Sequence, residues 1–107
     1  MSGSSFHRLA PASDIPASSM RAYSVGDREV LVCRTKDGLY AIDNICSHGY
    51  AKLNEGRLRG VRVICPLHGA SFDCRNGAVL GAPANAPLHS YPLRVVDDWV
   101  EIELAAV

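Results

Sequence analysis

The segments Cys46–His48, which reads Cys-Ser-His, and Cys65–His68, which reads Cys-Pro-Leu-His, decide how this 107-residue chain is interpreted. Each segment supplies one thiolate sulfur and one imidazole nitrogen, and 16 residues separate the two segments. A glycine follows each histidine, so the backbone can turn sharply beside each pair. Two such loops can clamp a metal centre between them. The sequence therefore predicts a metal centre bound by Cys46, His48, Cys65 and His68.

Two kinds of metal centre match a set of two cysteines and two histidines. Zinc would bind all four side chains in one tetrahedron. A [2Fe-2S] cluster of mixed ligation would take both sulfurs on one iron and both imidazoles on the other. Structural zinc sites usually pair cysteines two to four residues apart and histidines three to five residues apart. Here each loop pairs a cysteine with a histidine, which favours the cluster and leaves a zinc-stabilised interaction module as an alternative.

The order Cys-x-His, 16 residues, Cys-Pro-x-His-Gly resembles the Rieske iron–sulfur family. The flanking residues 40–43 and 69–73 agree with it, and the resemblance extends over roughly residues 20–104. It implies an all-β fold for a single domain, residues 1–107: a Rieske-type β-sandwich with a small loop-rich cluster-binding subdomain at about 44–84. By the same resemblance, Cys46 and Cys65 ligate the buried iron, and His48 and His68 ligate the outer iron near the surface.

The chain is similar to the small Rieske ferredoxins of multicomponent aromatic-ring dioxygenases. This resemblance implies a monomeric one-electron carrier that passes electrons from a flavin-dependent ferredoxin reductase to a terminal Rieske oxygenase. We expect no catalytic site, because His7 and His89, the two remaining histidines, do not suggest a two-histidine, one-carboxylate iron site. A small Rieske-like subunit of a nitrite reductase is the alternative from the enzyme class.

The cluster loops also predict the reduction potential. High-potential members of the family carry two further loop cysteines that form a disulfide, and serine and tyrosine hydroxyls that donate to sulfur. The corresponding positions here are Ala51 and Leu67 for the cysteines, and Ala70 and Phe72 for the hydroxyls. Without these donors, negative charge on the sulfurs is less stabilised. We therefore expect a potential around −150 mV, at the low end of the Rieske range.

Composition excludes several function classes. The 11 basic and 11 acidic side chains balance, and no basic run suggests a nucleic-acid partner. No apolar stretch reaches the roughly 18–20 residues that cross a bilayer, and residues 1–5 do not resemble a signal peptide. We therefore expect no membrane association and a cytoplasmic location. In a reducing compartment, four cysteines favour metal binding over disulfides.

Short alternating segments separated by turns predict strands and no amphipathic helix. Asp37-Gly38 predicts a hairpin turn, as does the segment 75–77. We expect an irregular segment at 44–60 that carries the first ligand pair. The expected strands are 6–10, 20–25, 28–35, 39–42, 61–64, 69–73, 78–80, 90–96 and 99–104.

The other cysteines and aromatic residues have plainer interpretations. Cys33 lies in an apolar strand and is expected to be a buried thiol. Cys74 precedes a turn and is expected to be a half-exposed free thiol. We expect Tyr91 and Trp99 in the core.

Two groups of residues could meet a partner. An apolar rim around the expected histidine ligands would form the docking face. Arg57, Arg59 and Arg62 could attract an acidic partner or could form a solvated loop face. The expected rim consists of Gly49, Tyr50, Leu67, Pro83, Ala84 and Pro87.

Overall fold

The computed structural model describes residues 4–47, 51–67, 69–82, 84 and 86–105. The described part forms 11 strands and two short 3-10 helices, η1 (Ala12–Asp14) and η2 (Leu53–Glu55), without an α-helix. The strands form three antiparallel sheets. The predicted all-β class is therefore confirmed. Within the described ranges, no helix is long and apolar enough to cross a membrane.

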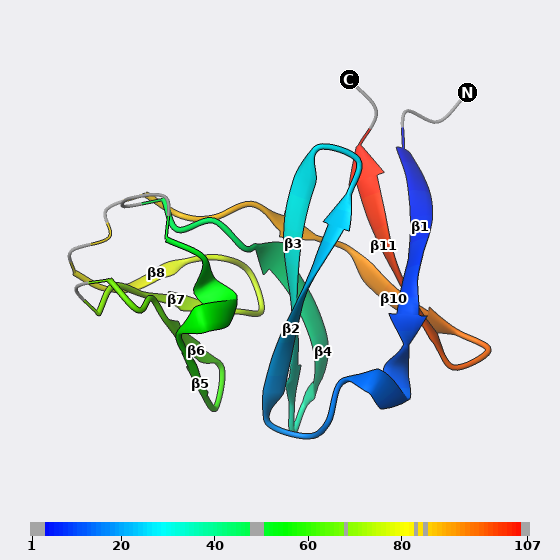
Figure 1. Ribbon diagram of the computed structural model, residues 1–107, viewed down its shortest axis with the longest axis horizontal. Helices are drawn as coiled ribbons and strands as arrows, with labels where there is room; N and C mark the ends of the chain where they lie inside the picture. Colours follow the sequence, from blue (N-terminus) through cyan, green and yellow to red (C-terminus); the bar gives the residue numbers. More distant parts are fainter. Residues whose placement is uncertain (1–3, 48–50, 68, 83, 85, 106–107) are drawn as a thin grey trace.

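The first two sheets pack as a sandwich (Figure 1). One has the strand order β1-β11-β10 and the other has the order β2-β3-β4-β9. Val30 and Val32 of the second sheet share a buried apolar cluster with Val100 and Ile102 of the first. The strands of the first sheet are β1 (Ser4–Pro11), β10 (Leu93–Val96) and β11 (Trp99–Ala105). The strands of the second sheet are β2 (Ser19–Val25), β3 (Arg28–Thr35), β4 (Gly38–Asp43) and β9 (Ser90–Tyr91).

The third sheet lies at the opposite end of the molecule from the two chain termini (Figure 1). Its strand order is β5-β6-β7-β8. Its core residues Val63 and Phe72 pack with Leu31 and Ile42, which come from β3 and β4. This sheet lies within residues 44–84, the segment predicted to form the cluster-binding subdomain. Its strands are β5 (Arg57–Arg59), β6 (Arg62–Ile64), β7 (Ser71–Asp73) and β8 (Val79–Gly81).

The apolar run of β3 follows from its position between the two other sheets. Successive side chains of a strand point to opposite faces. Val30 and Val32 face the first sheet, whereas Leu31 and Cys33 face the third. Because both faces are covered, all four residues are fully buried and the strand shows no alternation of polar and apolar residues.

The predicted strand 90–96 is wrong as a single element. The structure divides it at Pro92 into β9, which pairs with β4, and β10, which pairs with β11. Proline has no backbone N–H to donate to a ladder, so the strand leaves one sheet there and joins the other. The strand β5 was also missed within the segment 44–60, because three residues are too few for a periodic pattern.

The predicted core position of Trp99 is also wrong, because this side chain is only partly buried. The guanidinium carbon of Arg8 lies 5.1 Å from the centroid of its ring. Tyr91 is buried as predicted. Its hydroxyl donates to Asp43 and accepts a hydrogen bond from Arg28. Together with burial, the bond to Asp43 raises the pKa of Tyr91 to about 12.

Gly77, in the turn between β7 and β8, is hydrogen-bonded to the segment that leads back to the sandwich. Its amide donates to the carbonyl of Asp73, and its carbonyl accepts from the amide of Leu88. Its φ is +80°, and a Cβ at this position would lie 2.1 Å from the carbonyl oxygen of Leu88. The turn after β7 therefore requires glycine for both its conformation and its close backbone contact.

We expect G77A to lower the free energy of unfolding by about 3 kcal/mol, because it adds overpacking to the cost of a positive φ. G26A is the matched control, since Gly26 has φ +63° and nothing within 4 Å of the added Cβ. Its expected loss is about 1 kcal/mol. Urea unfolding followed by circular dichroism measures both variants. Equal losses for the two would contradict the proposed close contact.

Candidate metal centre

The first predicted loop connects β4 to η2 and carries Cys46. The amide of Cys46 donates to the carbonyl of Ala51 at 2.9 Å, and Ile45 forms a bridge with Lys52. These contacts bring the two described ends of the loop side by side. The side chain of Cys46 is thereby held in the interior, where it is 3 % exposed.

The side chain and backbone of Asn44 connect this loop to the neighbouring segments by hydrogen bonds. Its fully buried side-chain carbonyl accepts the amide of Asn54 at 2.9 Å, and its side-chain amide donates to the Asn54 side chain at 2.9 Å. Its backbone carbonyl accepts the amide of Leu53 at 2.7 Å. The side-chain amide also donates to Glu29 of β3 at 3.3 Å. A buried amide with all these partners fixes the loop to the second sheet.

The second predicted loop connects β6 to β7 and carries Cys65. The amide of Cys65 donates to the carbonyl of Ala70 at 2.7 Å. Each cysteine amide thus bonds to the carbonyl five residues further along, and the two loops share one mode of closure. The amide of Leu67 donates to the Cys65 sulfur at 3.4 Å. Such a donor stabilises negative charge on a thiolate ligand.

The two loops bring the two cysteines together. Cys46 and Cys65 belong to the same buried cluster, where the Cys65 side chain is 2 % exposed. Burial raises the pKa of Cys65, the Cys46 thiol raises it further, and the Leu67 amide opposes the shift. A bound cation reverses this balance, because it favours the thiolate. The pair therefore fits the sulfur half of the predicted ligand set.

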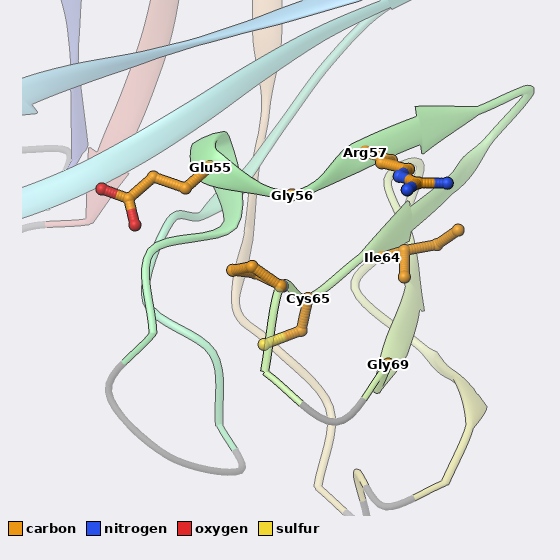
Figure 2. A pocket seen from close by; sticks show the side chains of 7 residues that line it. Glu55, Gly56, Arg57, Ile64, Cys65 and Gly69 are labelled. Carbon is orange, nitrogen blue, oxygen red and sulfur yellow. The ribbon is translucent and has the colours of Figure 1, made fainter.

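Cys65 also lines a hollow at the end of the third sheet. Figure 2 shows its sulfur pointing into the space between the two loops, whereas Arg57 and Ile64 extend to another side. Gly56, which precedes β5, lies close to the end of β6. A Cβ at this position would lie 1.9 Å from the carbonyl oxygen of Ile64, so the close approach of the two segments requires glycine. The lining consists of Glu55, Gly56, Arg57, Ile64, Cys65, Pro66 and Gly69.

The predicted ligands His48 and His68 lie outside the described residues. Within the described part of the chain, no group of three or more His, Cys, Asp and Glu side chains could hold a metal ion. The structure describes where Cys46 and Cys65 lie, in one buried cluster. The role of all four residues as ligands stays a prediction.

The predicted apolar rim is placed only in part. Leu67 is 44 % exposed and Pro87 is exposed, as a docking residue must be. Ala84 is buried, so its assignment to the rim is wrong. Gly49, Tyr50 and Pro83 lie outside the described residues.

A third segment closes over the first loop. The hydroxyl of Ser47, which follows Cys46, donates to the carbonyl of Ala86 at 2.6 Å. Buried Ala84 and Leu88 from this segment join the apolar cluster that contains Cys46 and Cys65. The described residues of this segment therefore form part of the buried surroundings of both cysteines.

Cys33 and Cys74 form a second pair of buried thiols, in the same apolar cluster as Cys46 and Cys65. The predicted half-exposed position of Cys74 is wrong, because both side chains are fully buried. The neighbouring Cys74 thiol and burial raise the pKa of Cys33, which favours its protonated form. None of the four cysteines, all of which are described, forms a disulfide. Cys33 is a buried thiol, as predicted.

Sequence reasoning missed Asn44 and Gly56. Both lie in the segment 44–60, which was expected only to be irregular. A buried asparagine carries no signal in a single sequence, because its partners are identified only when the loop is closed. Gly56 could have been noticed as a glycine in front of an alternating segment.

The residues 5–92 match the family model of the Rieske [2Fe-2S] domain. The chain belongs to the Rieske [2Fe-2S] domain family. This assignment confirms the predicted resemblance and the predicted cofactor, one Rieske-type [2Fe-2S] cluster.

The curated relatives of this Rieske domain include ferredoxins. The ferredoxin subunit of anthranilate 1,2-dioxygenase from Burkholderia cepacia is 36 % identical over 92 % of this chain and 92 % of its own length. Among solved structures, the ferredoxin of carbazole 1,9a-dioxygenase from Nocardioides aromaticivorans IC177 is 31 % identical. It superimposes with a TM-score of 0.89 over 96 % of this chain and 99 % of that one. The predicted class of electron-transfer ferredoxins is therefore confirmed.

A second similar solved structure is a complex of a ferredoxin with its oxygenase. A complex of reduced oxygenase and oxidised ferredoxin in carbazole 1,9a-dioxygenase includes a chain that is 32 % identical to this Rieske domain. The TM-score is 0.85, and the match covers 91 % of each chain.

The alternative prediction, a small subunit of a nitrite reductase, is supported only by a likeness in fold. A putative small subunit of an NADH-dependent nitrite reductase from Mycobacterium tuberculosis superimposes with a TM-score of 0.83 over 97 % of this chain and 98 % of that one. Its sequence is only 20 % identical. The likeness extends to the fold alone.

We expect N44A to reduce cluster loading and to lower the free energy of unfolding by about 3 kcal/mol, because it leaves the backbone amide of Asn54 without its acceptor and removes the side-chain bonds to Asn54 and Glu29. N54A is the matched control, since its side chain is exposed and its amide keeps its acceptor. Its expected loss is about 1 kcal/mol or less. Iron and acid-labile sulfide analysis and urea unfolding measure both. Full loading of N44A would contradict the role of Asn44.

Proposed function

We propose that this Rieske domain is the ferredoxin of a multicomponent aromatic-ring dioxygenase, and that it carries single electrons from a flavin-dependent reductase to a terminal oxygenase. The observation that carries the proposal is the pair of buried cysteines held by two similarly closed loops, in a chain related to dioxygenase ferredoxins over nearly its full length. An oxygenase partner is further supported by the related complex of oxygenase and ferredoxin.

The ligand set forms part of this proposal. Cys46 and Cys65 ligate the inner iron, and His48 and His68 ligate the outer iron. The burial of the two cysteines in one cluster supports the first half of this assignment. The position of each histidine in the family pattern supports the second half. A cluster held in this way supplies a one-electron couple.

The residues around the sulfurs perform two physical tasks. Ala70 and Phe72 are fully buried and apolar, so they exclude water from the inner side without donating hydrogen bonds. The Leu67 amide is the donor that reaches the Cys65 sulfur. Because hydroxyl donors are replaced by apolar groups at these two positions, added negative charge is weakly stabilised. This supports the predicted low potential.

Electron transfer without catalysis completes the proposal. The named relatives are ferredoxin components rather than oxygenases, which supports a carrier with no catalytic site of its own. We also propose that the chain acts as one domain and as a monomer, with the cluster-binding subdomain at about 44–84. A cytoplasmic location stays a prediction from the sequence.

We expect the purified protein to be red-brown and to contain about two irons and two acid-labile sulfides per chain. After dithionite reduction it should give an electron paramagnetic resonance signal, and a redox titration should fit one electron with a midpoint around −150 mV. Colourless protein with stoichiometric zinc would end the proposal. A midpoint above about +100 mV would refute the low-potential interpretation.

We expect H48C to retain a cluster with a lower midpoint potential than the unmodified protein, because a thiolate adds a negative charge where an imidazole is neutral. H7C is the matched control, since His7 is exposed on β1. Its potential should be unchanged. The measurement is a redox titration of both variants. An unchanged potential in H48C would count against His48 as a ligand.

A further inference from the structure

The charges of this neutral chain are unevenly divided. The segment 44–84 contains five basic and two acidic side chains, whereas the rest of the chain contains six basic and nine acidic ones. The cluster-bearing part is thus positive by three charges, and the remainder is negative by three. Figure 1 shows the third sheet, which forms much of this segment, at the opposite end from the termini. In the described part of the chain, Lys52 and Arg75 of this segment are ion-paired with Glu29 and Asp73, so the positive charge outside ion pairs comes from the arginines of β5 and β6.

Three arginines of the β5–β6 hairpin form this positive surface. Arg59 pairs with Arg62 across the hairpin, and Arg57 pairs with Ile64. Because paired residues share one face of a sheet, the three arginines lie on the same face. Leu58 and Val63 pack on the opposite face, toward the core. We call Arg57, Arg59 and Arg62 the arginine face; all three are exposed.

The carboxylates near the arginine face do not neutralise it. Asp73 is the one acidic residue between positions 56 and 88, and Arg75 holds it in an ion pair at 2.8 Å. Glu55 extends in the direction opposite to Arg57 (Figure 2). Across the described residues, no ion pair involves the arginine face.

One of the arginines is held in place, which orders the face. Arg62 donates to the hydroxyl of Ser71 on β7 at 2.6 Å. Gly81 on β8 leaves room for this contact, because a Cβ there would lie 2.6 Å from that hydroxyl oxygen. Arg57 lines the same hollow as Cys65. The arginine face therefore borders a hollow that the second cluster loop also lines.

From this arrangement we infer that the arginine face docks against a carboxylate-rich surface of the terminal oxygenase, beside the point where that oxygenase accepts electrons. The inference rests on the proposed function, since it names the chemistry of the acceptor surface. A positive end on a neutral molecule orients the cluster toward an acidic partner during approach, and so raises the association rate at low salt.

The first test uses small oxidants as probes of local charge. Stopped-flow absorbance follows the oxidation of dithionite-reduced protein by ferricyanide, an anion, and by tris(phenanthroline)cobalt(III), a cation. Ionic strength is raised from about 10 to about 150 mM, which shortens the Debye length from roughly 30 to roughly 8 Å. We expect the ferricyanide rate to fall severalfold and the cobalt rate to rise.

Two double variants separate local charge from net charge. R57Q/R59Q removes two charges from the arginine face but leaves Arg62 and its structural hydrogen bond intact. R21Q/K36Q removes two exposed charges elsewhere and is the matched control. We expect R57Q/R59Q to lose most of the salt dependence and R21Q/K36Q to retain it. Equal effects of the two variants would overturn the inference.

The second test uses a protein acceptor, the terminal oxygenase of carbazole 1,9a-dioxygenase. We expect R57Q/R59Q to reduce its rate of reduction by this ferredoxin roughly tenfold at low salt and to match the unmodified protein at high salt. R21Q/K36Q should not differ from the unmodified protein. Equal rates for R57Q/R59Q and the unmodified protein at low salt would overturn the inference. A protein without a cluster reacts with no oxidant, and that result would refute the proposed function instead.

Discussion

The burial of Cys46 and Cys65 in one cluster is the constraint on which the predicted metal centre depends. Neither cysteine lies within a strand. Each lies in a loop closed by its own amide and the carbonyl five residues further along. The third sheet and its connections hold these loops at the required distance. Their core, around Val63 and Phe72, is anchored on the second sheet.

The position of the site at one end of the molecule separates two physical demands. The sandwich supplies burial, with β3 covered on both faces. The third sheet carries an exposed leucine, an arginine face and the second cluster loop. A carrier benefits from this division, because the surface that meets partners can differ in charge and shape without altering the sandwich. The unequal division of charge between 44–84 and the remainder is consistent with such an arrangement.

The structure also shows how single residues direct the chain between layers. Pro92 ends β9 in one sheet, and the next residue begins β10 in the other. Gly77 accepts the amide of Leu88 and so ties the turn after β7 to the segment that leads into β9. Asn44 performs the same task for the first cluster loop. In each case a local property determines a long-range connection. The property is the missing N–H of Pro92, the missing Cβ of Gly77 and the short polar side chain of Asn44.

The sequence by itself determined the all-β class, the family and the four expected ligands, because turn residues, strand alternation and the Cys/His spacing are local features. The strand 28–35 was predicted with its bounds for the same reason. Only the tertiary structure decided that 90–96 divides between two sheets, that Trp99 is partly exposed and that Cys74 is buried against Cys33. It also decided that the three arginines share one face and that Asn44 closes the first loop. These outcomes depend on which distant segments pack together, and a single sequence carries no record of that pairing.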